Sequence, residues 1–194
     1  MQLSDGTIQL SPQIGTLTLY TKREGFGSSA GHDLTIVATA WSGVARQEDG
    51  RISLEVSVDP SGLSVKEGHG GARALTDSDR RDIERNLREK VLETGSNPRI
   101  DFRSSEVTTL DDADDRLRLS VSGTLELHGQ QQPLKVDVDI HRGDEGLMVL
   151  SSATIVQTRW GIRPYRAFMG ALKVADAIDV RVVATLPATV ITGS

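Results

Sequence analysis

The segment RLRLSVSGTLELHGQQQPLKVDVDI, residues 116–140, decides the fold class of this chain. Apolar and polar side chains alternate along residues 117–127, and they alternate again along residues 134–140. This period of two is typical of strands with one buried and one solvated face, which pair in antiparallel fashion. His128 and Gly129 between the two halves are turn signals. The segment therefore predicts a β-hairpin.

The same alternation recurs in six other segments and gives eight expected strands in total. The further segments are residues 16–20, 34–40, 52–58, 100–104, 149–155 and 178–186. Parallel strands buried between helices would be apolar on both faces, and these segments are not. The pattern predicts an all-β antiparallel fold.

Only residues 77–94 show a helical period. Ile83, Leu87 and Val91 are spaced by four and form a narrow apolar stripe. Asp77 is typical of a first helical turn, and Gly95 is a stop signal. We expect one amphipathic helix that covers an apolar surface. No internal boundary has the composition of a linker, so we expect a single domain over residues 1–194 with its core at about 15–187.

The length of the strand at 116–127 favours a barrel over a two-sheet sandwich, because tilted barrel strands are long. We therefore expect an eight-stranded antiparallel up-and-down barrel with one amphipathic helix packed against it. Several residues on the apolar faces are small, and they either leave an interior space or fit tight curvature. They are Ala38, Ala40, Ser104, Gly123, Ser151, Ala153 and Ala184.

Composition excludes several classes of function. The net charge of −5 gives no reason to expect a nucleic-acid partner, and the absence of cysteine excludes disulfides and thiolate metal sites. The four histidines lack ligand spacing, so we expect no metal and no cofactor. No nucleophile elbow or other catalytic constellation is visible, so we do not expect an enzyme.

Hydropathy gives an expectation for location. No apolar run approaches the length of a membrane span, and the first residues lack the basic and apolar regions of a signal peptide. We expect no membrane span and a cytoplasmic location.

The segment TRWGIRPYRAFMGALKV, residues 158–174, departs from the alternation. It holds three of the seven aromatic residues, Trp160, Tyr165 and Phe168, interleaved with arginines. It falls between the seventh and eighth expected strands and so lies at one barrel end. Two interpretations remain open: its aromatic residues close that end, or the segment forms the mouth of a ligand site.

A set of motifs in a fixed order resembles the YceI-like family from about residue 15 to 187. The motifs are GHDLTI at 31–36, LEVSVDPSGLSV at 54–65, SNPRIDFRSSEV at 96–107, VSGTLELHGQQQPLKVDVDI at 121–140, RWGI at 159–162 and a strand with Asp-x-Ile-Asp-Val at 176–180. The resemblance implies a lipocalin-like barrel that binds a polyisoprenoid or another long amphiphilic chain, and it implies a possible homodimer. Many members are exported, whereas no signal peptide is visible here, and the helical segment lacks the family's aromatic pair.

We expect the chain to carry or sequester an apolar-chain small molecule of polyisoprenoid, quinone or fatty-acid type. The expected ligand contacts are Phe26, Leu34, Ile36, Phe102, Leu125, Leu127, Trp160, Ile162, Phe168, Met169 and Leu172. Arg159, Arg163 and Arg166 are candidates for binding an anionic head group, because the guanidinium suits phosphate and carboxylate. The alternative is a protein-interaction module with a filled barrel, in which the aromatic and arginine residues of 158–174 form the interface.

Overall fold

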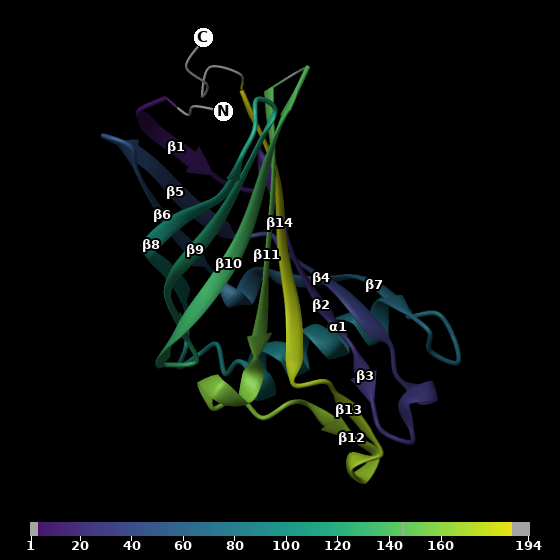
Figure 1. Ribbon diagram of the computed structural model, residues 1–194. Coiled ribbons are helices and arrows are strands. Elements are labelled where there is room, and N and C mark those ends of the chain that lie inside the picture. The colour runs from purple at the N-terminus through teal and green to yellow at the C-terminus, as the bar shows by residue number, and fades with distance from the viewer. Residues whose placement is uncertain (1–3, 145, 188–194) are drawn as a thin grey trace.

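The computed structural model, which describes residues 4–144 and 146–187, is an antiparallel sheet curled into a half-barrel with one α-helix across its lower end (Figure 1). The sheet is formed by β1 (Gly6–Leu10), β2 (Gly15–Thr21), β4 (Asp33–Ala38), β5 (Trp41–Glu48), β6 (Arg51–Val58), β7 (Leu63–His69), β8 (Ile100–Asp112), β9 (Arg116–Leu127), β10 (Gln130–Gly143), β11 (Gly146–Val156) and β14 (Ala177–Pro187). A small second sheet is formed by β3 (Arg23–Glu24), β12 (Arg166–Ala167) and β13 (Leu172–Val174).

The expected number of eight barrel strands is wrong. The main sheet has eleven strands in the order β1-β5-β6-β8-β9-β10-β11-β14-β2-β4-β7, with β1 and β7 at its ends. Seven of the eight expected segments lie within a strand of this sheet, the segment 34–40 extends two residues beyond β4, and β1, β5 and β7 were missed. The all-β antiparallel class is confirmed, but the sheet is a curled half-barrel and not the expected eight-stranded barrel.

Two of the extra strands, β5 and β7, arise at a corner of the chain. Residues 39–40 separate β4 from β5, and residues 59–62 separate β6 from β7. Pro60 has no N–H to donate to the sheet, and a Cβ at Gly62 would lie 2.8 Å from the Cβ of Ala40. Backbone hydrogen bonds from Thr39 N to Gly62 O and from Asp59 N to Ala40 O, both 2.9 Å, hold the corner together. Since β4 and β5 lie near opposite ends of the strand order, the sheet turns back on itself here.

The helix begins where the sequence predicts, and helical structure, with η3 included, ends three residues before the expected end. In α1 (Asp77–Asn86), the Thr76 side chain accepts a hydrogen bond from Asp79 N, and the Asp79 carboxylate accepts one from Thr76 N, which is a capping box. The chain continues as a wider helical turn, η3 (Leu87–Val91), where Leu92 N donates to Leu87 O at 2.9 Å.

Helix α1 covers the free edge of β7. Glu84 Oε1 accepts hydrogen bonds from Ser64 Oγ at 2.9 Å and from the backbone N–H of Val65 at 2.8 Å. Arg80 donates to the backbone carbonyls of Val65 and Lys66. These contacts satisfy backbone groups that an edge strand leaves unpaired.

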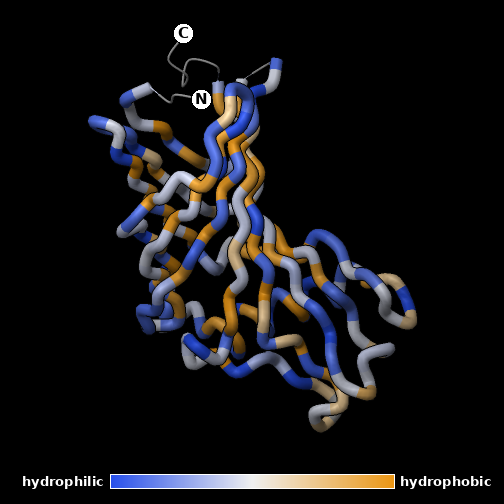
Figure 2. The backbone as a smooth tube through the Cα atoms, in the orientation of Figure 1, coloured by the Kyte–Doolittle hydropathy of each residue, from blue (hydrophilic) through white to orange (hydrophobic). Residues whose placement is uncertain are grey.

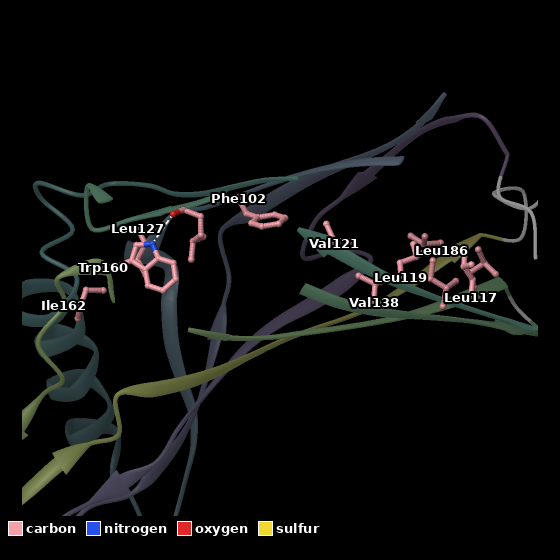
Figure 3. Packing of buried hydrophobic residues seen from close by; sticks show 12 residues of the cluster. Phe102, Leu117, Leu119, Val121, Leu127, Val138, Trp160, Ile162 and Leu186 are labelled. Atoms are coloured by element: carbon pink, nitrogen blue, oxygen red, sulfur yellow. Dashed lines mark hydrogen bonds between the residues drawn. The ribbon is translucent and has the colours of Figure 1, made fainter. Parts of the chain in front are cut away.

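The apolar faces of the strands form two buried clusters, and Figure 2 shows the alternating hydropathy that produces them. The first lies along β8–β11 and β14 and contains Phe102, Leu117, Leu119, Val121, Leu125, Leu127, Val138, Ile140, Leu147, Trp160, Ile162 and Leu186 (Figure 3). The second lies on β2 and β4–β7 and contains Leu17, Ile36, Ala38, Trp41, Val58, Leu63 and Val65.

Small residues on the apolar faces have two different explanations. A Cβ at Gly123 would lie 2.3 Å from the carbonyl oxygen of Arg103 and 2.7 Å from the Phe102 ring, so close packing requires glycine there. Ala38 and Ala184 are fully buried, whereas Ser151 and Ala153 on β11 are only half-buried. Tight packing therefore accounts for the first three residues and not for the last two.

Candidate ligand-binding site

The wall of the half-barrel opens between β10 and β11. These strands pair from Gly143 opposite Gly146 down to Asp137 opposite Ser152, and no further. Below that point β10 stays paired with β9 as far as Gln130, and β11 stays paired with β14 as far as Val156. Figure 1 shows the two strands diverging toward the lower end.

A hollow of about 520 Å³ lies where these strands separate. Its lining includes residues from both faces of the sheet. Polar and charged residues come from the outer face and from the following segment, namely Lys135, Asp137, Ser152, Thr154, Arg159, Asp179 and Arg181. Leu134, Ala153 and Val180 belong to the alternating inward-facing set, and Pro133 completes the lining.

The inward-facing residues beside this hollow are incompletely covered. Leu19 on β2 lies opposite Val180 on β14, and Val180 lies opposite Ala153 on β11, so the three residues form one rung across the sheet. All three are half-buried, whereas Leu17 and Ile178 on the same faces are fully buried. Half-burial extends to other inward residues of the same strands and their neighbours: Leu34, Leu134, Val136, Val149, Ser151, Ile155 and Val182.

The outer rim carries three cations and two carboxylates. Arg159 lies over the ring of Trp160, with its Cζ 5.6 Å from the centroid, and Arg181 lies over the ring of Tyr20 at 5.1 Å. Asp179 accepts a hydrogen bond from Thr154 Oγ1 at 3.0 Å. Among the described residues neither guanidinium is ion-paired with a carboxylate. Both remain available to an anionic group at the rim.

The segment between β11 and β12 closes the lower end of the sheet beside this opening. Trp160, at the end of the short helix η4 (Gln157–Trp160), is 1% exposed and donates from Nε1 to Leu125 O at 3.0 Å (Figure 3). Ile162 is buried beside it. Thr158 fixes the segment to the start of β14 through two hydrogen bonds to Asp176, of 2.9 and 2.6 Å. Trp160 is therefore core and not part of an exposed interface.

The residues expected to contact a ligand divide into separate groups. Those fully buried in the two clusters are Ile36, Phe102, Leu125, Leu127, Trp160 and Ile162. Leu34 and Leu172 are half-buried, Phe26 and Met169 are exposed, and the side chain of Phe168 lies outside the described part of the chain. Of the three head-group candidates, Arg159 lines the hollow, while Arg163 and Arg166 are exposed on the segment that follows. Their roles in ligand binding stay predictions.

Sequence reasoning missed the residues that line the hollow apart from Arg159. The alternation placed Leu134, Ala153 and Val180 on apolar faces. It placed Lys135 and Arg181 on polar faces. Nothing in their alternation marks the separation of β10 from β11. The one available signal is the weaker apolar face of residues 149–155, where Ser151 and Ala153 replace larger side chains.

Two negative findings concern the described residues. No group of three or more histidine, aspartate and glutamate side chains in residues 4–144 and 146–187 is arranged to hold a metal ion. No helix in the same part of the chain is both long and apolar enough to cross a lipid bilayer.

The model of the YceI-like domain matches residues 16–186 of this chain. Three solved structures share its fold at low sequence identity, whereas no curated protein sequence matches it. Burkholderia cenocepacia BcnA has a TM-score of 0.62 at 13% identity, over 88% of this chain and 96% of that chain. A polyisoprenoid-binding domain from Saccharophagus degradans, implicated in plant cell wall breakdown, has a TM-score of 0.58 at 14% identity, over 94% and 100%. A YceI protein from Campylobacter jejuni has a TM-score of 0.50 at 11% identity, over 96% and 87%.

Proposed function

The chain belongs to the YceI-like family, and on that premise we propose that it binds a long-chain apolar or amphiphilic molecule within the curled sheet. A similar structure is named for polyisoprenoid binding, which supports a ligand of polyisoprenoid, quinone or fatty-acid type. Family membership points to a binding protein and not to an enzyme.

The apolar chain of the ligand lies along the inward rung formed by Leu19, Val180 and Ala153. These side chains are half-buried, whereas Leu17 and Ile178 on the same faces are fully buried, so they keep apolar area that a ligand can remove from water. Burial of apolar surface contributes about 25 cal/mol per Å². Small side chains at Ser151 and Ala153 provide room for that chain beside β11.

The head group lies at the rim where β10 and β11 separate. Arg159 and Arg181 present guanidiniums that stack on aromatic rings and lack carboxylate partners among the described residues, and Lys135 adds a third cation. Guanidiniums bind phosphate and carboxylate in bidentate fashion, which favours an acidic or phosphorylated head group. Asp137 and Asp179 on the same rim disfavour a second anion.

A single observation carries this proposal: one hollow of about 520 Å³ is bordered by inward apolar residues and by an outer cationic rim. Its size falls within the range of small-molecule sites. An amphiphile needs both environments next to each other, with its chain and its head on opposite sides of the sheet.

Native mass spectrometry of the chain, purified from its source organism without detergent, tests the proposal. We expect a population heavier than the polypeptide by the mass of one apolar-chain molecule, and we expect organic extraction to remove that mass. Detection of the bare polypeptide alone, both before and after incubation with an excess of a long-chain amphiphile, would contradict ligand binding.

A protein-interaction role has support from a different surface. Leu150 on β11 lies opposite Val183 on β14, and both side chains, together with Met148, are exposed on the outer face. Exposed apolar residues that lie together favour a protein contact. The expected homodimer stays a prediction, and sedimentation of the wild-type chain beside a Leu150→Lys variant tests it. A monomer in both cases would contradict it.

A further inference from the structure

We propose that the end of the molecule formed by the small sheet β3–β12–β13 docks onto a lipid bilayer with anionic head groups. This inference rests on the proposed function, because bilayers are where apolar-chain ligands reside. The docking surface consists of the loop 25–27 and the segment 163–174, which we call the tip (Figure 1).

Two apolar side chains project from the tip into solvent. Phe26 is 94% exposed and Met169 is 108% exposed, the two highest values among the exposed large apolar residues of the described chain. The other exposed large apolar residues of the described chain have exposed fractions of about half or less. The full exposure of Phe26 and Met169 contributes nothing to folding, and exposed apolar residues that lie together are typical of interaction sites.

The two side chains belong to one structural unit. Gly27, next to Phe26, donates its N–H to the carbonyl of Ala171 at 3.0 Å, and Ala171 follows Met169 by two residues. Leu172 packs against Gly31, where a Cβ would lie 2.5 Å from the leucine Cδ1. The loop that carries Phe26 and the loop that carries Met169 are therefore held against each other.

The backbone at Met169 supports a role for its side chain. Its φ of 54° lies in the left-handed region, which glycine and asparagine adopt more readily than methionine. Gly170, next to it, has a φ of 89° and already provides the conformational freedom of the turn. A strained conformation that is retained at a fully exposed residue supports a functional role for its side chain.

The charge of the tip matches an anionic surface. The tip contains Arg163, Arg166 and Lys173 and no aspartate or glutamate, in a chain whose net charge is −5. Arg166 and Lys173 are paired across β12 and β13, and Lys173 also contacts Glu24 at 3.1 Å. Arg163 and Arg166 are exposed without an ion-pair partner among the described residues. Apolar side chains surrounded by basic ones are typical of proteins that lie at the bilayer interface.

The tip also adjoins the ends of the strands that carry the apolar rung. Strand β3 follows β2 after one residue, and β13 is separated from β14 by two. Ala175 N donates to Lys22 O at 2.7 Å and joins these two connections. A ligand that leaves the bilayer at the tip therefore enters at the ends of the two strands that carry Leu19 and Val180.

Flotation of the full chain with lipid vesicles tests this proposal. We expect binding to phosphatidylcholine vesicles that contain phosphatidylglycerol, weak binding to pure phosphatidylcholine, and a loss of binding at high salt. Phe26→Ser with Met169→Ser should weaken partitioning by about tenfold or more, because interfacial burial of two apolar side chains is lost. Arg163→Gln and Arg166→Gln should each weaken it by about fivefold, which corresponds to about 1 kcal/mol per basic residue near an anionic surface.

Matched controls lie elsewhere on the surface. Leu110→Ser removes an exposed apolar side chain from β8, and Arg142→Gln removes an exposed arginine from β10. Both should leave vesicle binding unchanged, and all variants should keep the thermal unfolding midpoint of the wild-type chain. Equal binding by the tip and control variants, or binding independent of anionic lipid, would overturn the proposal.

A parallel titration with a dansyl-labelled long-chain fatty acid, added from ethanol, separates docking from ligand binding. Probe binding without any vesicle binding overturns the docking proposal and leaves the proposed function intact. Vesicle binding that the tip variants abolish, without probe binding by the wild-type chain, supports docking and contradicts the proposed function.

Discussion

The indole N–H of Trp160 donates a 3.0 Å hydrogen bond to the backbone carbonyl of Leu125, which lies 35 residues earlier on β9. Both residues are buried in the same cluster, together with Ile162. The bond joins the segment after β11 to the hairpin β9–β10, from which β11 has separated. Trp160 thereby closes the lower end of the sheet beyond the point where the ladder between β10 and β11 ends.

We expect Trp160→Phe to lower the free energy of unfolding by about 1–2 kcal/mol, because the Leu125 carbonyl loses its buried donor. Trp41 provides a matched control: it is also buried, but its Nε1 has no hydrogen-bond partner among the described residues. Trp41→Phe makes the same change in volume and removes no hydrogen bond. Denaturant unfolding of both variants measures the difference. Equal destabilisation would show that the Trp160 bond contributes nothing.

The stability of α1 should depend on pH through Asp79. The Arg73 guanidinium, which donates to both carboxylate oxygens, and the backbone N–H of Thr76 hold the pKa of Asp79 well below its ordinary value of 3.8. Because the folded pKa lies below the unfolded one, the stabilising contribution is complete above pH 3.8. It is lost as the pH falls through 3.8 toward the folded pKa.

Asp79→Asn therefore should destabilise the helix at neutral pH. The variant should also lose less stability than the wild-type chain as the pH falls into the acid range. Far-UV circular dichroism during thermal unfolding, recorded from neutral pH into acid, measures both effects. Asp77→Asn is the control, since Asp77 lies on the same first turn without these hydrogen bonds. The effect will be modest because the Asp79 pair is solvent-accessible and screened. An identical acid transition in wild type and Asp79→Asn would contradict this role.

Affinity should rise with the length of the ligand's apolar chain. Each methylene that moves from water to the inward face contributes about 0.8 kcal/mol, so affinity for a series of fatty acids should increase about fourfold per methylene until the face is filled. Competition against a fluorescent fatty acid measures the series. An affinity independent of chain length would contradict burial of the apolar chain on the inward face. It would mean that contacts at the rim alone provide the binding free energy.

Sequence alone predicted the elements that alternation and capping specify. The hairpin of residues 116–140 became β9 and β10, and the stripe of Ile83, Leu87 and Val91 became α1 with η3. Alternation records which face of a strand is buried, so it found the strands in the middle of the sheet. The corner at Pro60 and Gly62 depends on contacts with Ala40 and Thr39, which are about 20 residues away, so β5 and β7 were missed.

The candidate site was predicted only in part for the same reason. Ala153 and Val180 were assigned to apolar faces, but their half-burial depends on how far apart β10 and β11 lie. The pairing of β10 with β11 ends at Asp137 and Ser152, and this end of the ladder has no local signature in the sequence. Arg159 was identified because its residue type, and not its position, suits an anionic group.

Titration of the chain with a dansyl-labelled long-chain fatty acid tests the central claim, binding within the curled sheet, most directly. Ala153→Phe fills the inward face beside β11, whereas Leu150→Phe places the same ring on the outer face of the same strand, outside the lining of the hollow. We predict saturable binding of one probe by the wild-type chain and by Leu150→Phe, with binding by Ala153→Phe weakened at least tenfold while its folded state persists. Equal probe binding by Ala153→Phe and the wild-type chain would contradict it.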